Sequence, residues 1–491
     1  MKELRHPMNK PVRRTAVFSL FLVFCLLVWV TWVQAAEAGG LDDNPHNERL
    51  SIAKYAHPLG DIVVGGDPVT GSAATDGDLK YKRTYRDGPL YAPVTGYSSQ
   101  IYGSTQLERL DQSVLDGSDS RLKNPGQALL REASKPGDVI TTIDPAVQKA
   151  AYKALGHKTG AAVAIDPATG RILGMASTPS YDPSTFAGMS AADQKAWEKL
   201  QKDPAQPMVN RALRQPLAPG STFKLVVAAA ALENGLYSSI DDKTKTPDPY
   251  LLPGTHTYVH NESAADPCEN ATIREALQYS CNTVFANLAV HLGEHKLSEQ
   301  AEKFGFNDDK IDTPTRAYQS VFPSGMNAAQ TGLSGFGQFD VTATPLEMAM
   351  VTSAIANDGK LMSPYVVDRT TDGSSGALDV TKPRTYKDGR VMSADTAHQL
   401  QSAMRTVVEK GTGSNAKIDG LTVGGKTGTA QHGVDNSGKP YARFVSYARD
   451  GHGKQVAVAV MVQSSDAERA EVSGNGQAAP VAKAMMRAAL G

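Results

Sequence analysis

The chain has 491 residues, of which 41% are hydrophobic and 21% are charged, and its formal net charge is −1. This length exceeds one ordinary domain, and the apolar content is sufficient for a large buried core. The near-zero net charge gives no reason to expect nucleic acid as a partner.

The N-terminus joins a basic segment to an apolar one. Ala16–Val33 contains no charged residue and is long enough to cross a bilayer as a helix. Because a basic flank stays in the cytoplasm, we predict a cytoplasmic tail over residues 1–14, a transmembrane anchor over 15–34 and an extracytoplasmic remainder. Ala36-Glu37-Ala38 resembles a cleavage site, so a cleaved signal peptide is the alternative.

The next segment, residues 35–135, carries no motif with evident chemistry. Asn44-Pro45 indicates a short stalk, and Ile62–Val64 and Leu90–Val94 have the composition of short strands between glycine turns. Pro93 would confine the second of these strands to a sheet edge. We predict a small, irregular, β-rich and non-catalytic domain close to the membrane.

Residues 136–491 predict an α+β domain. Asp144-Pro145 opens a helix that ends at Leu155, and a hairpin follows over residues 160–177. Residues 184–420 are mainly helical. Further strands and a last helix are predicted at Leu421–Ala430, Arg443–Ala448, Val456–Val462 and Pro480–Leu490. Strands at both ends of a helical middle indicate one sheet completed by the terminal segments.

The first motif with chemical potential is Ser221-Thr222-Phe223-Lys224. It follows Pro219-Gly220 and leads directly into an apolar helical run, unlike three other Ser-x-x-Lys segments that lie in polar stretches. The three other segments are Ser51–Lys54, Ser120–Lys123 and Ser414–Lys417. The apolar helix that follows therefore favours Ser221 among the four serines as the candidate reactive residue.

Ser221 and Lys224 are three residues apart, so a helix places them on one face. A serine at a helix start lies beside unpaired backbone N–H groups, which stabilise a developing oxyanion. Apolar neighbours desolvate Lys224 and lower its pKa, which would let a neutral amine take the serine proton. The alternative is a capping serine followed by a surface lysine.

Two further motifs follow in the chain. Ser280-Cys281-Asn282 lies between two predicted helices, where a hydroxyl can relay a proton and an amide can bind a peptide carbonyl. Lys426-Thr427-Gly428-Thr429 lies in a glycine-rich strand and suits a substrate carboxylate. Taken singly, the alternatives are a polar helix connection and a glycine-rich turn.

The three motifs, in this order on an exported and anchored chain, resemble the signature of penicillin-binding proteins. Residues 136–491 resemble the transpeptidase domain of a class B penicillin-binding protein of the A type, and residues 35–135 resemble its non-catalytic pedestal. The implied fold is an antiparallel sheet with a largely helical subdomain. The implied activity is cross-linking of peptidoglycan stem peptides through a serine acyl-enzyme that β-lactams trap.

The resemblance also implies roles for individual residues. Ser221 is the nucleophile, Lys224 the base and Ser280 the proton relay. The substrate-binding residues are Asn282, Lys426, Thr427, Gly428 and Thr429. No metal or organic cofactor is implied, and a lipid-embedded glycan polymerase is the expected partner. Cys268 and Cys281 are the two cysteines outside the apolar segment, and we hypothesise that they form a disulfide in the oxidising exterior.

Rival functions remain open from the sequence. The same fold and motifs also serve a D,D-carboxypeptidase, a β-lactamase or a β-lactam sensor. His291-Leu292-Gly293-Glu294-His295 matches an inverted zinc-peptidase motif. That motif needs a continuous helix to bring both histidines to one face, whereas Gly293 indicates a helix end.

Overall fold

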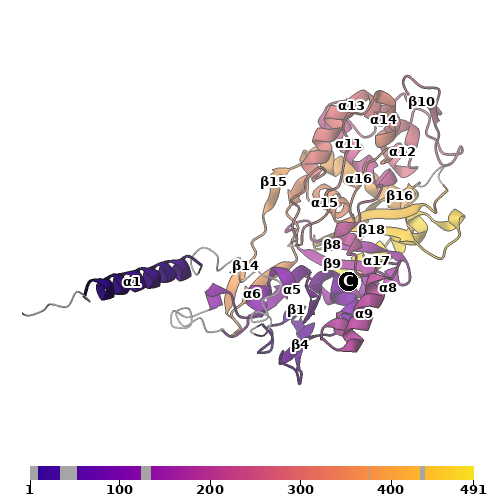
Figure 1. Cartoon of the computed structure of the whole chain (residues 1–491). Helices are drawn as coiled ribbons and strands as arrows, with labels where there is room; N and C mark the ends of the chain where they lie inside the picture. Colours follow the sequence, from indigo (N-terminus) through magenta and orange to yellow (C-terminus); the bar gives the residue numbers. More distant parts are fainter. Residues whose placement is uncertain are drawn as a thin grey trace, which may run out of the picture. The chain divides into compact units, whose positions relative to one another are not determined.

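The computed structural model describes residues 9–33, 52, 54–122, 134–313, 315–374, 376–431 and 437–491. The chain forms two compact units. One unit contains Met1–His57 with Ala74–Tyr81, and the other contains Pro58–Ala73 with Lys82–Gly491 (Figure 1). The second unit holds all three motifs.

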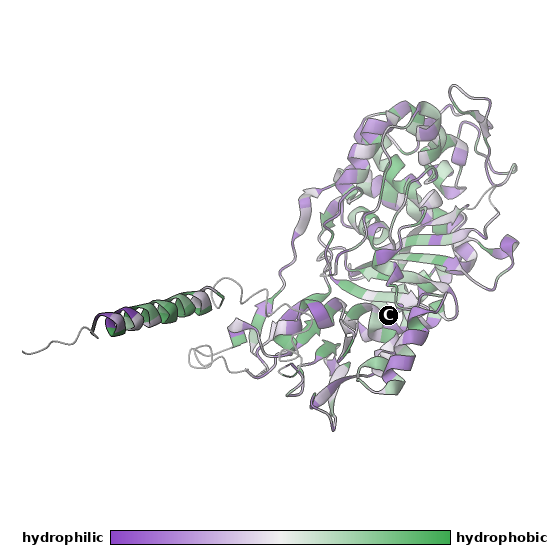
Figure 2. Ribbon diagram, viewed as in Figure 1, coloured by the Kyte–Doolittle hydropathy of each residue, from purple (hydrophilic) through white to green (hydrophobic). Residues whose placement is uncertain are grey.

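The first unit contains the helix α1 (Asn9–Trp32), which is apolar along most of its length (Figure 2). Its stretch Lys10–Trp32 is long and apolar enough to cross a membrane, and large side chains such as Leu20 are exposed to 69%. Such exposure is stable only in an apolar surrounding. The predicted cleavage site at Ala36–Ala38 and the stalk at Asn44-Pro45 lie outside the described residues.

The core of the second unit is a five-stranded antiparallel sheet in the order β16-β17-β18-β8-β9. The strands are β8 (Thr159–Ile165), β9 (Ile172–Thr178), β16 (Thr422–Ala430), β17 (Tyr441–Arg449) and β18 (Gln455–Ser464). The predicted hairpin and the three later strands are confirmed, and so is a sheet completed by both ends of the domain. The edge strand β16 carries the Lys426 motif.

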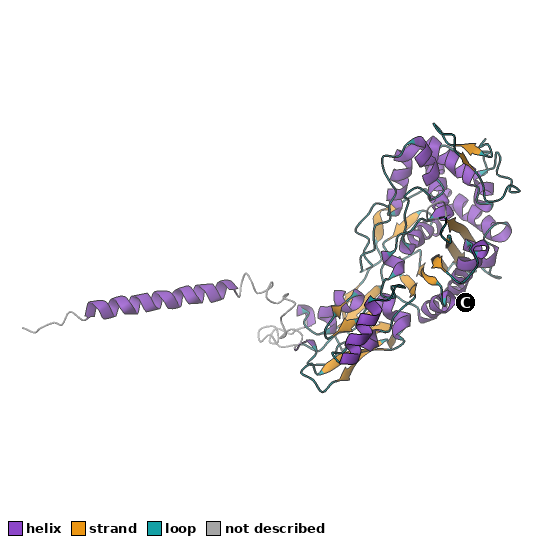
Figure 3. Cartoon of the chain, turned by 45° about the vertical axis from the view of Figure 1, so that its right-hand side comes forward, coloured by secondary structure: helices purple, strands orange, loops and turns teal. Residues whose placement is uncertain are grey.

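Helices cover both faces of this sheet, as Figure 3 shows in purple. Alternate strand residues face opposite sides, so Val163 and Ala459 join one core cluster while Ala162 and Val458 join another. The first cluster contains α11 (Lys224–Glu233), α15 (Pro345–Ala356) and α16 (Ala394–Lys410); the second contains α8 (Pro145–Leu155) and α17 (Ala479–Leu490). Burial on both faces explains why these strands are almost continuously apolar.

A helical subdomain extends from the α11 side. It contains α12 (Ile273–Gln278), α13 (Asn282–Phe304) and α14 (Ala328–Ser334), with the short strands β10 (Tyr250–Leu251) and β11 (Tyr258–Val259). Thr272 caps α12 through a reciprocal pair with Glu275. Gly293, with φ 76° and ψ 161°, interrupts α13, so the predicted helix end at this residue is confirmed.

The segment before residue 123 mixes short strands with short helices. The strands are β1 (Ile62–Val64), β2 (Asp67–Pro68), β3 (Thr70–Ala74), β4 (Tyr81–Tyr85), β5 (Ser98–Ser99) and β6 (Gly103–Ser104), and the α-helices are α4 (Gly88–Thr95), α5 (Gln106–Leu110) and α6 (Gln112–Leu115). The predicted strand at Leu90–Val94 is wrong, because these residues form α4. Pro89 at the first helical turn fixes a helical φ, and the buried side of α4 outweighs the strand-like composition.

A second sheet joins the early segment to the later domain. Its order is β14-β13-β7-β1-β2, with β7 (Val139–Thr141) parallel to β1 and antiparallel to β13 (Val367–Thr371). β14 (Ala377–Val380) lies at its edge. The predicted boundary at residue 135 therefore lies between two strands, β1 and β7, that pair directly, and it stays a prediction.

Candidate active site

The three motifs lie together at the β16 edge of the central sheet. Ser221 is in the 3₁₀ turn η4 (Gly220–Phe223), which leads into α11, so it lies one turn before the predicted α-helix. Gly220 adopts φ 54° and donates its N–H to the carbonyl of Gly337 at 3.1 Å. A side chain on Gly428 would approach Thr222 to 3.0 Å, so its absence lets β16 pack against η4.

Lys224 is fully buried and bound to the second motif. Its Nζ lies 2.7 Å from the Ser280 carbonyl oxygen, 2.8 Å from Asn282 Oδ1 and 3.3 Å from Ser280 Oγ. The side chain therefore reaches the turn between α12 and α13 and cannot be a surface lysine. The snorkelling alternative for Lys224 is excluded by this burial.

Lys426 approaches the same hydroxyl from β16. Its Nζ donates to Ser280 Oγ at 2.9 Å and to the Thr427 carbonyl at 3.0 Å, and it is also fully buried. Ser280 Oγ therefore connects two buried lysines from two different elements. Thr427 is 8% exposed, and its Oγ1 lies 2.8 Å from Thr412 Oγ1.

Burial in this network disfavours positive charge. Desolvation lowers the pKa of Lys224 well below its ordinary value, the charge of Lys426 lowers it further, and Glu262 raises it. Desolvation lowers the pKa of Lys426 to about 7, against an upward effect of Glu262. Because both amines share Ser280 Oγ, two simultaneous positive charges are unfavourable. We assign the neutral amine to Lys224.

The turn that carries Ser280 is held by a covalent bond and by a neighbouring loop. A disulfide joins Cys268 to Cys281, and Ser280 adopts φ 61°, which is uncommon for a residue with a side chain. Asn261 Oδ1 accepts the backbone N–H groups of Asn282 at 2.6 Å and Thr283 at 3.2 Å. These contacts position the Asn282 amide.

A cavity of about 510 Å³ opens over these residues. Ser221, Asn282 and Thr429 line it, so it connects all three motifs. Ser221 is 6% exposed, which leaves its hydroxyl reachable from the cavity. The remaining lining residues are His260, Asn261, Glu262, Leu333, Phe336, Gln338, Phe339 and Gln431.

Sequence reasoning missed several residues that shape this site. Asn261 and Thr412 lie in loops without a recognisable pattern, and only long-range contacts reveal them. Arg443 is 2% exposed, and its Nη2 donates to the carbonyls of Leu217 at 2.7 Å and Ala343 at 3.2 Å. For Arg443, the one signal in the sequence was a charged residue inside an otherwise apolar strand.

The competing sequence motifs lie elsewhere. Ser414 begins the short turn η5 (Ser414–Ala416), and its partner Lys417 is exposed. The zinc hypothesis fails on geometry, because the break at Gly293 separates the two histidines. Glu294 accepts the backbone N–H groups of Gly325 and Met326 instead.

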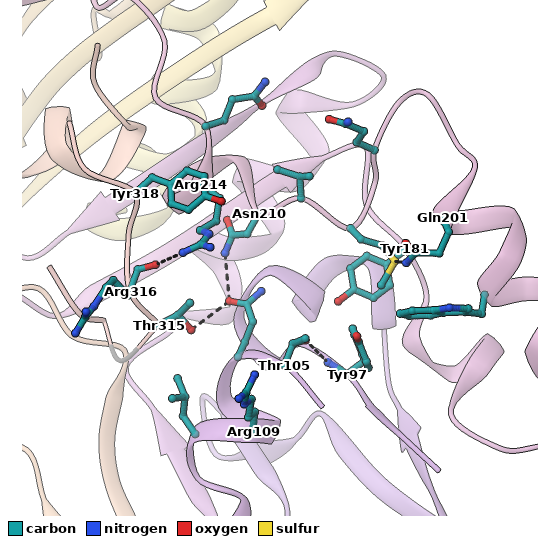
Figure 4. A pocket seen from close by; sticks show the side chains of 17 residues that line it. Tyr97, Thr105, Arg109, Tyr181, Gln201, Asn210, Arg214, Thr315, Arg316 and Tyr318 are labelled. Atoms are coloured by element: carbon teal, nitrogen blue, oxygen red, sulfur yellow. Dashed lines mark hydrogen bonds between the residues drawn. The ribbon is translucent and has the colours of Figure 1, made fainter. Parts of the chain in front are cut away.

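A larger cavity of about 790 Å³ is also present in the second unit (Figure 4). Three arginines and four aromatic residues line it. They are Arg109, Arg214, Arg316, Tyr97, Tyr181, Trp197 and Tyr318. No member of the three motifs is among its lining residues, so size alone does not identify the reactive site.

These features define a serine acyl-transferase site of the penicillin-binding class. The chain belongs to the penicillin-binding protein transpeptidase family, whose transpeptidase domain matches residues 160–487. A penicillin-binding protein A dimerisation domain matches residues 59–138. The predicted resemblance to the class B, A-type proteins is confirmed, and so is the predicted fold class.

Individual relatives are similar along almost the whole chain. The peptidoglycan D,D-transpeptidase PbpA of Mycolicibacterium smegmatis is 37% identical, with 98% of this chain and 99% of the relative covered. The Mycobacterium tuberculosis PbpA is 36% identical over the same shares. Penicillin-binding protein A of M. tuberculosis, in its penicillin G acyl-enzyme complex, superposes with a TM-score of 0.81 at 34% identity, over 88% of this chain and 99% of that structure.

Proposed function

We propose that this chain is a peptidoglycan D,D-transpeptidase that cross-links stem peptides through an acyl-enzyme on Ser221. The network of Lys224, Ser280 and Lys426 beneath the Ser221 cavity carries the proposal. Its support is geometric, since residues from α11, the α12–α13 turn and β16 meet at one hydroxyl. The names and acyl-enzyme structures of the relatives support the same activity.

The first step is acylation. A neutral Lys224 amine has two N–H donors, matched by the Ser280 carbonyl and Asn282 Oδ1, so its lone pair is left to accept a proton. Lys224 takes the Ser221 proton as Oγ attacks the penultimate D-Ala carbonyl. The proton passes by way of Ser280 to the leaving D-Ala amine, and the C–N bond breaks.

The neighbouring groups bind and stabilise the donor peptide. The backbone N–H groups of Ser221 and Thr429 are the proposed oxyanion hole. Thr427 and Thr429 contact the terminal carboxylate. Lys426 adds positive charge from its buried position. Gly428 leaves space for β16 to lie close to η4, and Asn282 holds the donor chain.

The second step transfers the acyl group to an amine of a neighbouring stem peptide. β-Lactams stop the enzyme at the acyl stage, because their ring-opened product stays on the serine. Transfer to water instead would make the chain a carboxypeptidase, so product analysis with a D-Ala-D-Ala peptide and an amine acceptor decides between the two outcomes.

We propose, from the N-terminal segments, that this activity lies outside the cell. We infer that residues 1–14 lie in the cytoplasm, residues 15–34 span the membrane and the catalytic domain, residues 136–491, is extracytoplasmic. Residues 35–135 serve as a non-catalytic pedestal. A lipid-embedded glycan polymerase would supply the uncross-linked strands and is the proposed partner.

The decisive experiment is labelling with a fluorescent penicillin. Ser221→Ala is expected to lose all covalent label while keeping the parental melting transition, and Ser414→Ala is the matched control that keeps its label. Mass mapping of the parental adduct locates the modified residue. An adduct on any residue other than Ser221, or a labelled Ser221→Ala protein, would falsify the assignment.

A further inference from the structure

One carboxylate in the catalytic cavity has no role in the steps above. Glu262 lines the cavity together with Ser221 and Thr429, and it is the one acidic residue among the described residues that do so. Its side chain is exposed, and the described part of the chain gives it no hydrogen bond or ion pair. An unpaired carboxylate beside the reactive serine attracts a cation from solution.

The position of Glu262 is fixed by its neighbour. Asn261 holds the backbone N–H groups of Asn282 and Thr283, and Asn282 Nδ2 donates to the His260 carbonyl at 3.2 Å. The two residues that precede Glu262 are thus tied to the second motif. This anchoring holds the Glu262 backbone next to the second motif, and its side chain lines the Ser221 cavity.

Among the residues that the structure describes, none forms an ion pair with Glu262. Glu262 interacts electrostatically with Lys224 and Lys426, and both of these lysines are fully buried and occupied by Ser280. The open side of Glu262 is the cavity, which is where the second substrate must enter after the D-Ala leaving group departs.

We propose that Glu262 is a positioning residue for the acceptor, and that it selects acceptors that arrive as a primary ammonium. This inference rests on the proposed transpeptidase function. The carboxylate binds the ammonium, which releases one proton to water at the cavity mouth. The resulting amine attacks the acyl carbon, its C–N bond forms and the Ser221 C–O bond breaks. The second amine proton passes to Lys224 and then to the serine oxygen.

The test separates acylation from acceptor use. Parent, Glu262→Gln, Glu262→Asp and Glu269→Gln proteins are compared at pH 7.5, using the full chain in detergent. Glu269 is an exposed carboxylate of the same loop that does not line the cavity, so it is the matched control. Each protein receives an acyl-D-Ala thioester donor, in which a thiol acid replaces the terminal D-Ala, with Nα-acetyl-lysine amide as a cationic acceptor or hydroxylamine as an uncharged one.

We expect Glu262→Gln to raise the KM for the cationic acceptor by about 3- to 10-fold, since one exposed charge pair is lost. Its KM for hydroxylamine stays within about twofold of the parent. Its penicillin acylation rate does not fall, because loss of the Glu262 charge lowers the pKa of Lys224 further and keeps this amine neutral. The KM of Glu262→Asp for the cationic acceptor is expected to lie between those of the parent and Glu262→Gln. Glu269→Gln is expected to have the parental KM for both acceptors.

Three results would overturn the inference. Unchanged use of the cationic acceptor removes the carboxylate from acceptor binding. An equal loss with both acceptors indicates a structural role for Glu262. A matching loss of penicillin acylation indicates that Glu262 acts only through the lysines. Mass mapping tests the transpeptidase proposal separately, because a penicillin adduct on a residue other than Ser221 would contradict that proposal alone.

Discussion

The Ser221 cavity and the larger cavity of the second unit both have cationic side chains close by, and they differ in how that charge is buried. The Ser221 cavity has a volume of about 510 Å³ and lies over two lysines that are 0% exposed. The larger cavity, of about 790 Å³, is lined by three exposed arginines. Arg214 stacks on the Tyr318 ring at 3.8 Å and donates to the Arg316 carbonyl at 3.0 Å.

This difference explains why only one cavity is suited to acyl transfer. A base must be free of its proton near neutral pH, and burial achieves this for Lys224. An exposed guanidinium keeps its proton and serves as a permanent charge. Desolvation of the cation, rather than the volume of the cavity, therefore marks the reactive site.

The largest expected effect comes from removing the buried amine. Lys224→Ala is predicted to slow penicillin acylation by roughly 10²- to 10⁴-fold, because the proposed base is lost. Stopped-flow or quenched labelling measures the rate. Lys417→Ala, which alters an exposed lysine of a competing motif, is the control and keeps the parental rate. A Lys224→Ala protein that acylates normally would assign the base elsewhere.

The second effect concerns the disulfide beside the Ser221 cavity. The bond between Cys268 and Cys281 closes a short loop that contains Ser280 and ends one residue before Asn282. Replacing both cysteines by alanine is predicted to lower the free energy of unfolding by about 3 kcal/mol, mainly by freeing the unfolded chain. Denaturant unfolding measures this change.

The control for the disulfide is Cys25→Ala, which removes the exposed free cysteine of α1. It leaves the unfolding of the catalytic unit unchanged. Thiol titration of the parent without reductant should detect one reactive cysteine. A count of three would show that Cys268 and Cys281 are not bonded.

The third effect is the pH dependence of acylation. Protonated lysine cannot accept the serine proton, so the rate falls as pH falls through the lowered pKa of Lys224. Below that pKa the loss is about tenfold for each pH unit. Acylation rates measured between pH 4 and pH 10 locate the pH at which the rate begins to fall. A fall that begins near pH 10.5, the ordinary pKa of lysine, would mean that burial does not neutralise the amine.

The same burial affects stability in a defined direction. The pKa of Lys426 is about 7 in the folded protein and 10.5 in its ordinary state, so between these values the unfolded chain binds more protons. The free energy of unfolding therefore rises with pH in this window. Lys426→Met lacks the titrating group, and its unfolding energy should rise less than that of the parent.

Local patterns were sufficient for much of this molecule. The apolar strands β8, β9 and β16–β18 and the helix stop at Gly293 follow from residues that are adjacent in sequence. The Ser-x-x-Lys segment was selected by its apolar helix. In each case the determining interactions lie within a few residues, so the sequence pattern carries the information.

Other features depend on contacts between distant segments. Leu90–Val94 has strand-like residues, yet burial makes it the helix α4. Asn261 acts on residues 21 and 22 positions later. Thr412 meets Thr427 from another element. These contacts depend on the tertiary fold, and the pattern of residues in a single segment does not predict them.

The smallest expected effect tests the larger cavity. Arg109 lies on α5, and its side chain is exposed, so its charge is screened by solvent. Arg109→Ala is predicted to leave the acylation rate within about twofold and the free energy of unfolding within about 0.5 kcal/mol. Penicillin labelling and denaturant unfolding check both values. A tenfold loss of acylation rate would show that this cavity is coupled to Ser221. In that case the difference between buried lysines and exposed arginines would no longer distinguish the reactive cavity from the unreactive one.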